Sequence, residues 1–238
     1  YCQTETMAAR LKNRFHPAGR IRILPNILPR ASRDRSWENH PDPLSGYAGR
    51  FRMICLSRYY SQKNFEIFLS LYRRHRRAME DTVLFLTLSP DQHPHAGSFL
   101  RQIRKQGLSE HLVNLGPIPQ PRIGAYFSRC QALLFPTLME SFSATYLEAM
   151  HYQLPIITSD LDFAREICGP GALYCDPRSA ESIRDCIVRL KTDPALRETL
   201  LGHQQTQAAR HAHYTWAQNA RQILSDIREH LPEPKERV

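Results

Sequence analysis

From Arg50 onward, short β-branched or aromatic runs alternate with longer stretches in which apolar residues return at helical spacing. Strands that alternate with amphipathic helices are typical of a parallel sheet covered by helices. The sequence therefore predicts an α/β fold with a doubly wound parallel sheet. The six expected strands are Phe51–Leu56, Thr82–Leu88, Leu112–Leu115, Ala132–Pro136, Pro155–Ser159 and Ala172–Tyr174.

Helices are expected between these strands and after the last of them. Asn64 is the expected cap of the first helix, in which Phe65, Phe68, Leu69 and Tyr72 recur at helical spacing. The other expected helices are Gly97–Gln106, Gln120–Arg129, Ser143–Tyr152, Ser179–Lys191, Pro194–His211 and Thr215–His230.

The first fifty residues have a different pattern. Met7–Phe15 is compatible with a helix, and Arg20–Leu24 alternates basic and apolar residues as a strand does. Pro29–Gly49 is rich in Pro, Arg, Asp, Ser and Gly, which predicts a linker or loop. The polar tail after Leu231 is expected to fray. The chain is therefore expected to begin within a longer protein.

The charge of the chain favours an anionic partner. The 238 residues carry a formal net charge of +9, with 42% hydrophobic and 23% charged residues, as in a globular protein. No interleaved basic and aromatic motif is present, so nucleic acid is not the expected partner. Arg73, Arg74, Arg76 and Arg77 form a local cluster. Cations in the last turns of a helix suit its macrodipole, and a membrane-facing patch is the competing interpretation.

The cysteines and the N-terminus bear on the compartment. The six cysteines form no CxxC pair, and several lie in apolar runs, which is typical of a reducing cytosol. No apolar run is long enough to cross a bilayer, and the N-terminus lacks a signal-peptide pattern. A cytoplasmic location is expected, with peripheral association at the inner face of the membrane left open. The histidines and cysteines show no metal-ligand spacing, so no metal site is expected.

Candidate chemistry lies in the turns that follow the strands, because doubly wound sheets bind ligands at the carboxyl ends of their strands. The turn after Phe51–Leu56 contains Arg58 and Lys63, two cations able to hold a diphosphate. The chain has neither GxGxxG nor GxxxxGK[ST], so a dinucleotide fingerprint and a P-loop are unsupported. Both residues could instead be ordinary surface charges.

The turn after Ala132–Pro136 contains two carboxylates. Glu140 lies in the expected loop, and Glu148 lies two turns along the next helix, whose free amides begin near Ser143. Amides suit a phosphate, and carboxylates accept hydrogen bonds from the hydroxyls of ribose or hexose. This pattern indicates a nucleotide-sugar site. The alternative is that Glu140 merely favours a helix N-terminus and that Glu148 is a solvated helix residue.

These turns resemble those of the large retaining glycosyltransferase family that includes sucrose synthases and bacterial mannosyl- and lipopolysaccharide-core transferases. Members of this group 1 family are of the GT-B type, with two Rossmann-like domains and a Glu-x7-Glu motif in the C-terminal, donor-binding domain. The resemblance extends from about Ile21 to His230. In chain order, the shared elements are Arg58, Lys63-Asn64, Gly116, Tyr126-Phe127, Pro136-Thr137, Glu140, Glu148, Ala149-Met150, Ser159-Asp160 and Tyr214-Thr215-Trp216.

The resemblance implies roles for the site residues. Arg58 and Lys63 would bind the donor diphosphate and stabilise the departing nucleotide, while Glu140 would contact the transferred sugar. These three are the candidate catalytic residues. The implied donor contacts are Ile118, Phe142, Ser143, Ala144, Thr145 and Glu148, with Glu148 on the ribose hydroxyls. The substrate would be a UDP-, GDP- or ADP-sugar, with no metal and no cofactor. Two departures from the family are Ser143 and Ser57, where glycine is usual.

The resemblance also implies how the chain is divided. Residues 1–49 would be the tail of an N-terminal domain and a linker, residues 50–213 the nucleotide-sugar-binding domain, and residues 214–238 a helix returning toward the N-terminal domain, followed by a frayed tail. The acceptor, a glycan or lipid-linked saccharide, would be bound mainly by the missing N-terminal domain. The chain alone is therefore expected to transfer a hexose weakly or not at all. Alternatives are a nucleotide-sugar epimerase of the same fold and a non-catalytic nucleotide-sugar-binding homologue.

Overall fold

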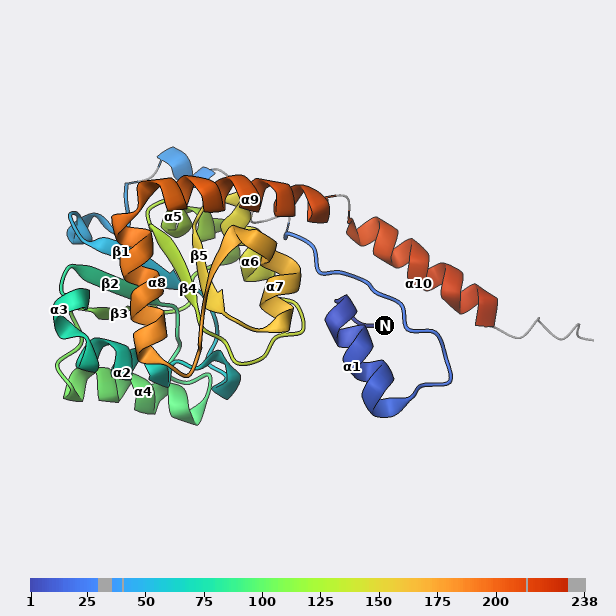
Figure 1. The fold of residues 1–238 in the computed structure, drawn as a ribbon, viewed down its shortest axis with the longest axis horizontal. Helices are drawn as coiled ribbons and strands as arrows, with labels where there is room; N and C mark the ends of the chain where they lie inside the picture. Colours follow the sequence, from blue (N-terminus) through green and yellow to red (C-terminus); the bar gives the residue numbers. More distant parts are fainter. Residues whose placement is uncertain (30–35, 40, 213, 231–238) are drawn as a thin grey trace, which may run out of the picture.

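The computed structural model describes residues 1–29, 36–39, 41–212 and 214–230. Its centre is a sheet of six parallel strands in the order β3-β2-β1-β4-β5-β6 (Figure 1). The strands are β1 (Phe51–Cys55), β2 (Thr82–Leu86), β3 (Leu112–Asn114), β4 (Ala132–Phe135), β5 (Ile156–Ser159) and β6 (Ala172–Cys175). The doubly wound parallel sheet is thus confirmed, and each of its six predicted strands is found to within two residues at either end.

The strands are buried because helices cover the sheet. All residues of β2, β4 and β5 are buried, as expected when both faces of a parallel sheet are packed. The helices are α1 (Glu5–Phe15), α2 (Glu66–Arg74), α3 (Arg76–Met79), α4 (Pro94–Lys105), α5 (Ile123–Phe127), α6 (Ala144–His151), α7 (Asp162–Cys168), α8 (Ala180–Thr192), α9 (Pro194–Ala212) and α10 (Trp216–His230). Helix α2 packs on α8, and α9 packs on α6 and α8.

Several helix boundaries differ from the prediction. Helix α4 begins three residues early, because Pro94 occupies its first turn and the His93 side chain accepts the His95 amide. The expected helix Gln120–Arg129 is instead a 3-10 turn, Gln120–Arg122, followed by the short α5. Helices α3 and α7 were not predicted. Among the described residues, no helix is long and apolar enough to cross a membrane.

Asn64 does not cap α2 with its side chain, so that prediction is wrong. Its backbone is left-handed, with φ of 61°, and its amide nitrogen donates to the carbonyl oxygens of Pro136 at 3.0 Å and Pro177 at 2.7 Å. A short polar side chain tolerates the left-handed conformation better than most residues. Asn64 therefore ties the turn after β1 to the turns after β4 and β6.

The N-terminal segment lies against α7 and α10 at one end of the molecule (Figure 1). The strand predicted at Arg20–Leu24 is wrong, because in the described part of the chain Ile23 forms an isolated bridge to Cys2 and no strand pairs with this segment. Within the expected linker Pro29–Gly49, Leu44 is fully buried, while residues 30–35 and 40 lie outside the described residues. The expected frayed tail, 231–238, also lies outside them.

Candidate functional site

The sheet order places the candidate turns next to each other. Strand β1 pairs with β4 in the register Met53↔Ala132 and Ile54↔Leu133, and the strand order reverses between them. At such a switch point the following segments diverge to opposite faces and leave a crevice at the carboxyl ends of the strands. The Lys63 turn follows β1, and the Glu140 loop follows β4. The topology thus brings two segments, distant in sequence, to one crevice.

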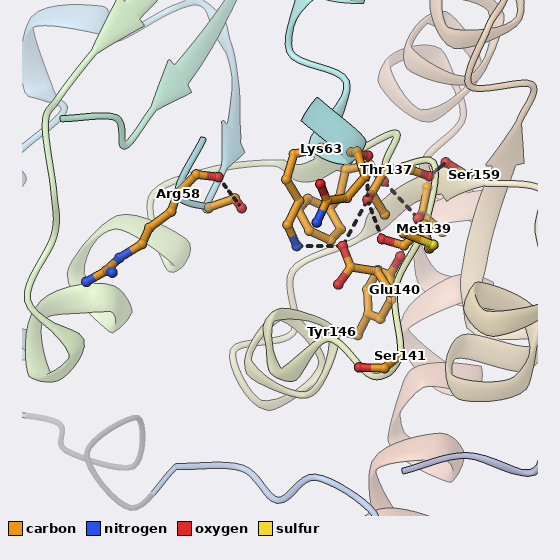
Figure 2. A network of polar contacts seen from close by, with 12 residues as sticks. Arg58, Lys63, Thr137, Met139, Glu140, Ser141, Tyr146 and Ser159 are labelled. Carbon is orange, nitrogen blue, oxygen red and sulfur yellow. Dashed lines mark hydrogen bonds and ion pairs between the residues drawn. The ribbon is translucent and has the colours of Figure 1, made fainter. Parts of the chain in front are cut away.

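Lys63 and Glu140 form an ion pair in this crevice (Figure 2). The Lys63 Nζ lies 2.5 Å from the Glu140 Oε1, and only 13% and 11% of the two side chains is exposed. The Thr137 hydroxyl donates to the same carboxylate oxygen at 2.9 Å, and the Lys63 Nζ lies 4.8 Å from the centre of the Phe135 ring. The ordinary-surface-charge interpretation is therefore wrong for Lys63. An ammonium has three donors, so Lys63 can bind Glu140 and an anion together.

Hydrogen bonds to backbone carbonyl oxygens hold this region together. The Leu138 amide donates to the carbonyl oxygen of Gln62 at 2.7 Å, and Asn64 donates to the Pro136 carbonyl oxygen. The Ser159 hydroxyl donates to the carbonyl oxygen of Thr137 at 2.5 Å. These bonds fix the relative position of the ammonium and the carboxylate without relying on the ion pair itself.

Arg58 is not brought to the ion pair. Its side chain is exposed, and its guanidinium extends away from Lys63 and Glu140 (Figure 2). The neighbouring Ser57 hydroxyl donates to the Arg58 carbonyl oxygen at 2.9 Å. The position of Arg58 as a diphosphate contact therefore stays a prediction that requires its side chain to turn toward the crevice.

Glu148 is almost entirely enclosed. It lies on α6 with 3% of its surface exposed, so its interpretation as a solvated helix residue is wrong. The Gln120 Nε2 donates to its Oε1 at 3.3 Å, which links α6 to the 3-10 turn after β3. A buried carboxylate is stable only with hydrogen-bond or charged partners, so such a group is well suited to hold ligand hydroxyls. Ile118, after the left-handed Gly116, packs half-buried on the core.

The N-terminus of α6 can offer backbone amides to a ligand. The first N–H groups of a helix lack the usual intrahelical acceptor, and the Ser143 side chain makes no capping bond, although the Tyr146 amide donates to the Ser143 carbonyl oxygen at 3.2 Å. Ser143 has φ of −92°, which any residue adopts, so the serine in place of glycine causes no backbone strain. Of the implied donor contacts here, Phe142 and Ser143 are buried, and Ala144 and Thr145 are half-buried.

A cleft of about 510 Å³ opens between α1 and the loop that follows β4, and Glu140 forms part of its wall. Its lining residues are Met7, Arg10, Leu11, Arg14, Phe15, Gln62, Met139, Glu140 and Ser141. The cleft therefore joins a helix of the N-terminal segment to the candidate catalytic carboxylate.

Helix α1 is anchored to α7 by charged contacts. The Glu166 carboxylate accepts the amides of Glu5 at 2.7 Å and Thr6 at 2.9 Å, and so binds the positive end of the α1 macrodipole. The Arg10 guanidinium contacts both oxygens of Asp162 at 2.6 Å. These contacts set the width of the cleft.

Sequence reasoning missed several residues of this region. The Ser141 hydroxyl donates to the Gln3 Oε1 at 2.7 Å, and Thr137 and Gln120 bind the two glutamates. The Gln3–Ser141 and Gln120–Glu148 contacts join positions 138 and 28 apart, so no local pattern could have indicated them; Thr137 lies three positions before Glu140, and its place in the quoted Pro136-Thr137 motif was the available signal.

Sequence reasoning overlooked Asp160-Leu161-Asp162, two carboxylates separated by one residue, a spacing that can bind a metal. Each carboxylate is instead occupied by an arginine: Asp160 accepts from Arg165 at 2.5 Å, and Asp162 accepts from Arg10. The hydrogen bond from Arg165 holds the pKa of Asp160 below its usual value. Within the described residues, no three His, Cys, Asp or Glu side chains converge as metal ligands would.

The six-stranded parallel sheet, in the order β3-β2-β1-β4-β5-β6, is the fold of the C-terminal domain of GT-B enzymes. The sequence profile of the family described as "Glycosyl transferases group 1" matches residues 38–207. The chain belongs to this family.

Two curated relatives are mannosyltransferases. The chain is 28% identical over 138 residues to the serotype-specific mannosyltransferase WbdA of Escherichia coli, a match that covers 58% of this chain and 17% of that protein. It is 32% identical over 100 residues to the O-antigen chain mannosyltransferase RfbU of Salmonella typhimurium, covering 42% of this chain and 28% of the relative. The chain thus spans less than a third of the length of either relative.

Solved structures share the fold at low sequence identity. Sucrose-phosphate synthase from Thermosynechococcus elongatus matches with a TM-score of 0.74 and 19% identity, over 96% of this chain and 57% of that one. The pneumococcal O-GlcNAc transferase GtfA, solved with UDP and GlcNAc, matches with a TM-score of 0.67 and 16% identity, over 96% of this chain and 44% of that one.

Proposed function

We propose that this chain is the donor-binding part of a retaining hexosyltransferase and that its crevice holds a nucleoside diphosphate-sugar. The observation that carries the proposal is the Lys63–Glu140 ion pair at the switch point, with the buried Glu148 on the adjoining helix. A cation for the diphosphate and two carboxylates for sugar hydroxyls are the groups that such a ligand requires.

In the proposed arrangement, Lys63 keeps Glu140 as one partner and donates its remaining N–H groups to the diphosphate. Arg58 turns from its exposed position to the same group, so that two cations stabilise the negative charge of the leaving nucleotide. Glu140 accepts hydrogen bonds from the transferred sugar, and the α6 amides from Phe142 to Thr145 contact the sugar or its phosphate. Glu148 holds the ribose hydroxyls, and Ile118 lines the base pocket. No metal is required in this scheme.

The relatives narrow the proposal to a mannosyl donor. Both are mannosyltransferases, and one acts on the O-antigen chain, so the acceptor of the whole protein is proposed to be a growing polysaccharide or a lipid-linked saccharide. Residues 50–213 form the proposed donor domain, residues 1–49 the end of an N-terminal domain and a linker, and residues 214–238 a segment returning toward that domain. The acceptor is proposed to bind mainly to the N-terminal domain. The cleft beside α1 is the proposed limit of the acceptor site within this chain.

The test is a thermal-shift panel of GDP-mannose, UDP-glucose, UDP-GlcNAc and ADP-glucose, with the corresponding free nucleoside diphosphates. We expect the ligands of one nucleobase to raise the melting temperature of the chain. Among the nucleotide-sugars, GDP-mannose should raise it most. A chain that no nucleotide stabilises would contradict the proposal. Product analysis with labelled donor separates a transferase from the epimerase alternative, since an epimerase would release a changed nucleotide-sugar. Sustained transfer by this chain alone would overturn the placement of the acceptor site in the N-terminal domain.

A further inference from the structure

A second concentration of charged side chains, mostly Lys and Arg, lies at the end of the sheet where strands β2 and β3 begin. Helices α2 and α4 run back against the strands, so their C-terminal ends lie where β2 and β3 begin, and α3 lies at the end of the molecule farthest from α10 (Figure 1). Segments 71–81 and 101–111 hold seven Lys and Arg residues against three Asp and Glu residues. We name these seven cations the basic edge: Arg73, Arg74, Arg76, Arg77, Arg101, Arg104 and Lys105.

The basic edge is not neutralised from within the protein. All seven side chains are exposed, and none of them forms an ion pair with a carboxylate in the described part of the chain. Of the nearby carboxylates, Asp81 is occupied by Lys191 at 2.7 Å. The helix macrodipole favours cations in the last turns of α2 and α4, which explains why they are there. It does not neutralise them, so they can still bind an anionic partner.

A depression of about 380 Å³ lies within this edge. Its lining residues are Tyr72, Arg76, Arg77, Glu80, Gly107, Leu108 and His111, so it is bordered by α2, α3 and the turn after α4. Of these lining residues, the two arginines are cationic and Glu80 is the single carboxylate. The volume exceeds what one phosphate group needs and suits a small anionic head group.

Arg50 and the Thr82 carbonyl oxygen both contact the histidine in this depression. The Arg50 guanidinium nitrogen lies 2.7 Å from the His111 Nδ1 and also donates to the Thr82 carbonyl oxygen at 2.5 Å. The same Nδ1 also lies 3.2 Å from the Thr82 carbonyl oxygen. His111 is thus held in place by Arg50 and Thr82, and it lines the depression beside the two arginines as a polar side chain.

We infer that the basic edge binds an anionic membrane surface, with one lipid phosphate held in the depression by Arg76, Arg77 and His111. A free phosphate would engage only the depression, whereas the cations on α2 and α4 around it form an extended field that matches a charged bilayer. Clusters of about 4–8 Lys or Arg residues are the size that recognises acidic lipids. Because this edge is opposite the Lys63–Glu140 crevice, membrane contact leaves the crevice open. The inference does not depend on what the crevice binds.

The experiment is co-sedimentation of the 238-residue chain with phosphatidylcholine vesicles prepared with and without phosphatidylglycerol. We expect binding only to the vesicles that contain phosphatidylglycerol, weakened by salt because exposed charges are screened. The double variant Arg76→Glu/Arg77→Glu should lose at least about tenfold in partitioning, because each cation near an acidic bilayer contributes substantially. The control Arg210→Glu/Arg228→Glu makes the same charge change on α9 and α10 and should bind as the wild type does. Circular dichroism verifies that both variants fold.

The depression is tested separately with His111→Phe, which leaves Arg76 and Arg77 in place, and with inorganic phosphate as a free anion. His111→Phe should weaken vesicle binding less than the double arginine variant. Absence of binding to phosphatidylglycerol vesicles, or equal losses in the double variant and its control, would overturn the inference. Saturable phosphate binding that requires Arg76 and Arg77, without vesicle binding, would also overturn it and assign the depression to a soluble anion.

Discussion

The ammonium of Lys63 lies 2.5 Å from the carboxylate of Glu140, although 77 positions separate the two residues in sequence. The ion pair holds the Lys63 ammonium in a fixed direction within the crevice. A preorganised charge of this kind needs little rearrangement on binding. The contact also joins the two turns whose residues carry the proposed chemistry.

Replacing Lys63 with Met should weaken binding of a nucleoside diphosphate at least about tenfold, because a hydrogen bond to a charged group contributes about 1.5–3 kcal/mol. Binding of the nucleoside without phosphates should change little, since methionine replaces the apolar stem of lysine and lacks its terminal ammonium. Calorimetry with both ligands measures the difference. Lys191→Met, which breaks the surface pair with Asp81, is the matched control. Equal losses for both ligands would contradict a role for Lys63 at the diphosphate.

Replacing Gly124 or Gly202 with alanine should change the stability of the fold in opposite directions. A Cβ at Gly124 would lie 2.3 Å from the Trp37 Nε1 and 2.7 Å from the Tyr152 hydroxyl, so Gly124→Ala should destabilise the fold by about 1–3 kcal/mol. A Cβ at Gly202, within α9, meets nothing within 4 Å, and Gly202→Ala should stabilise by about 0.5–1 kcal/mol. Urea unfolding measures both. A neutral Gly124→Ala would contradict the close approach of Trp37 to Gly124 in α5.

Glu166→Ala should loosen α1 from the cleft that contains Glu140. The substitution leaves the Glu5 and Thr6 amides without their acceptor, and losing such a cap costs about 1 kcal/mol of local stability. Amide hydrogen exchange in residues 7–15 should accelerate, while exchange in β4 should stay slow. Asp185→Ala, which removes a carboxylate from α8, should change neither. Unaltered exchange in residues 7–15 would mean that Glu166 does not hold this helix.

The cysteine thiols should be unreactive in the folded protein. All six cysteines are buried and free, and burial raises the pKa of the Cys55 thiol from 9.0 to about 12. The folded state therefore holds this proton more tightly than the unfolded state. The stability contributed is complete below pH 9 and is lost as the pH rises toward about 12. Thiol titration with Ellman's reagent at pH 8 should be slow without denaturant and complete in its presence. Rapid native labelling would contradict the burial.

The strands could be predicted because a buried strand produces a recognisable local sequence pattern. Strands such as β2 and β4 are covered on both faces, so they read as continuous apolar runs between polar turns. Helix α7 escaped prediction because it has only seven residues, too few to establish a helical period. Asn64 was predicted to be a helix cap because asparagine is a common capping residue. Its side chain instead donates hydrogen bonds to carbonyl oxygens 72 and 113 positions away.

The candidate site could be predicted in kind but not in arrangement. The turns after the strands and the family resemblance indicated Lys63 and Glu140 as site residues, whereas their contact, the direction of Arg58 and the position of α1 beside the cleft depend on tertiary packing. The Gln120–Glu148 contact joins turns of different strands. Such contacts follow from strand order, which pattern alone does not reveal.

Glu148 provides the most direct test of the account. Isothermal titration calorimetry with the nucleotide that stabilises the wild-type chain should be repeated with Glu148→Ala and with Glu38→Ala, an exposed glutamate in a 3-10 turn. The account predicts that Glu148→Ala loses binding of the nucleoside diphosphate and of its nucleoside alike, because the ribose contact is common to both, while Glu38→Ala binds as the wild type does. Undiminished nucleotide affinity in a folded Glu148→Ala protein would contradict the assignment of this crevice to a nucleotide-sugar.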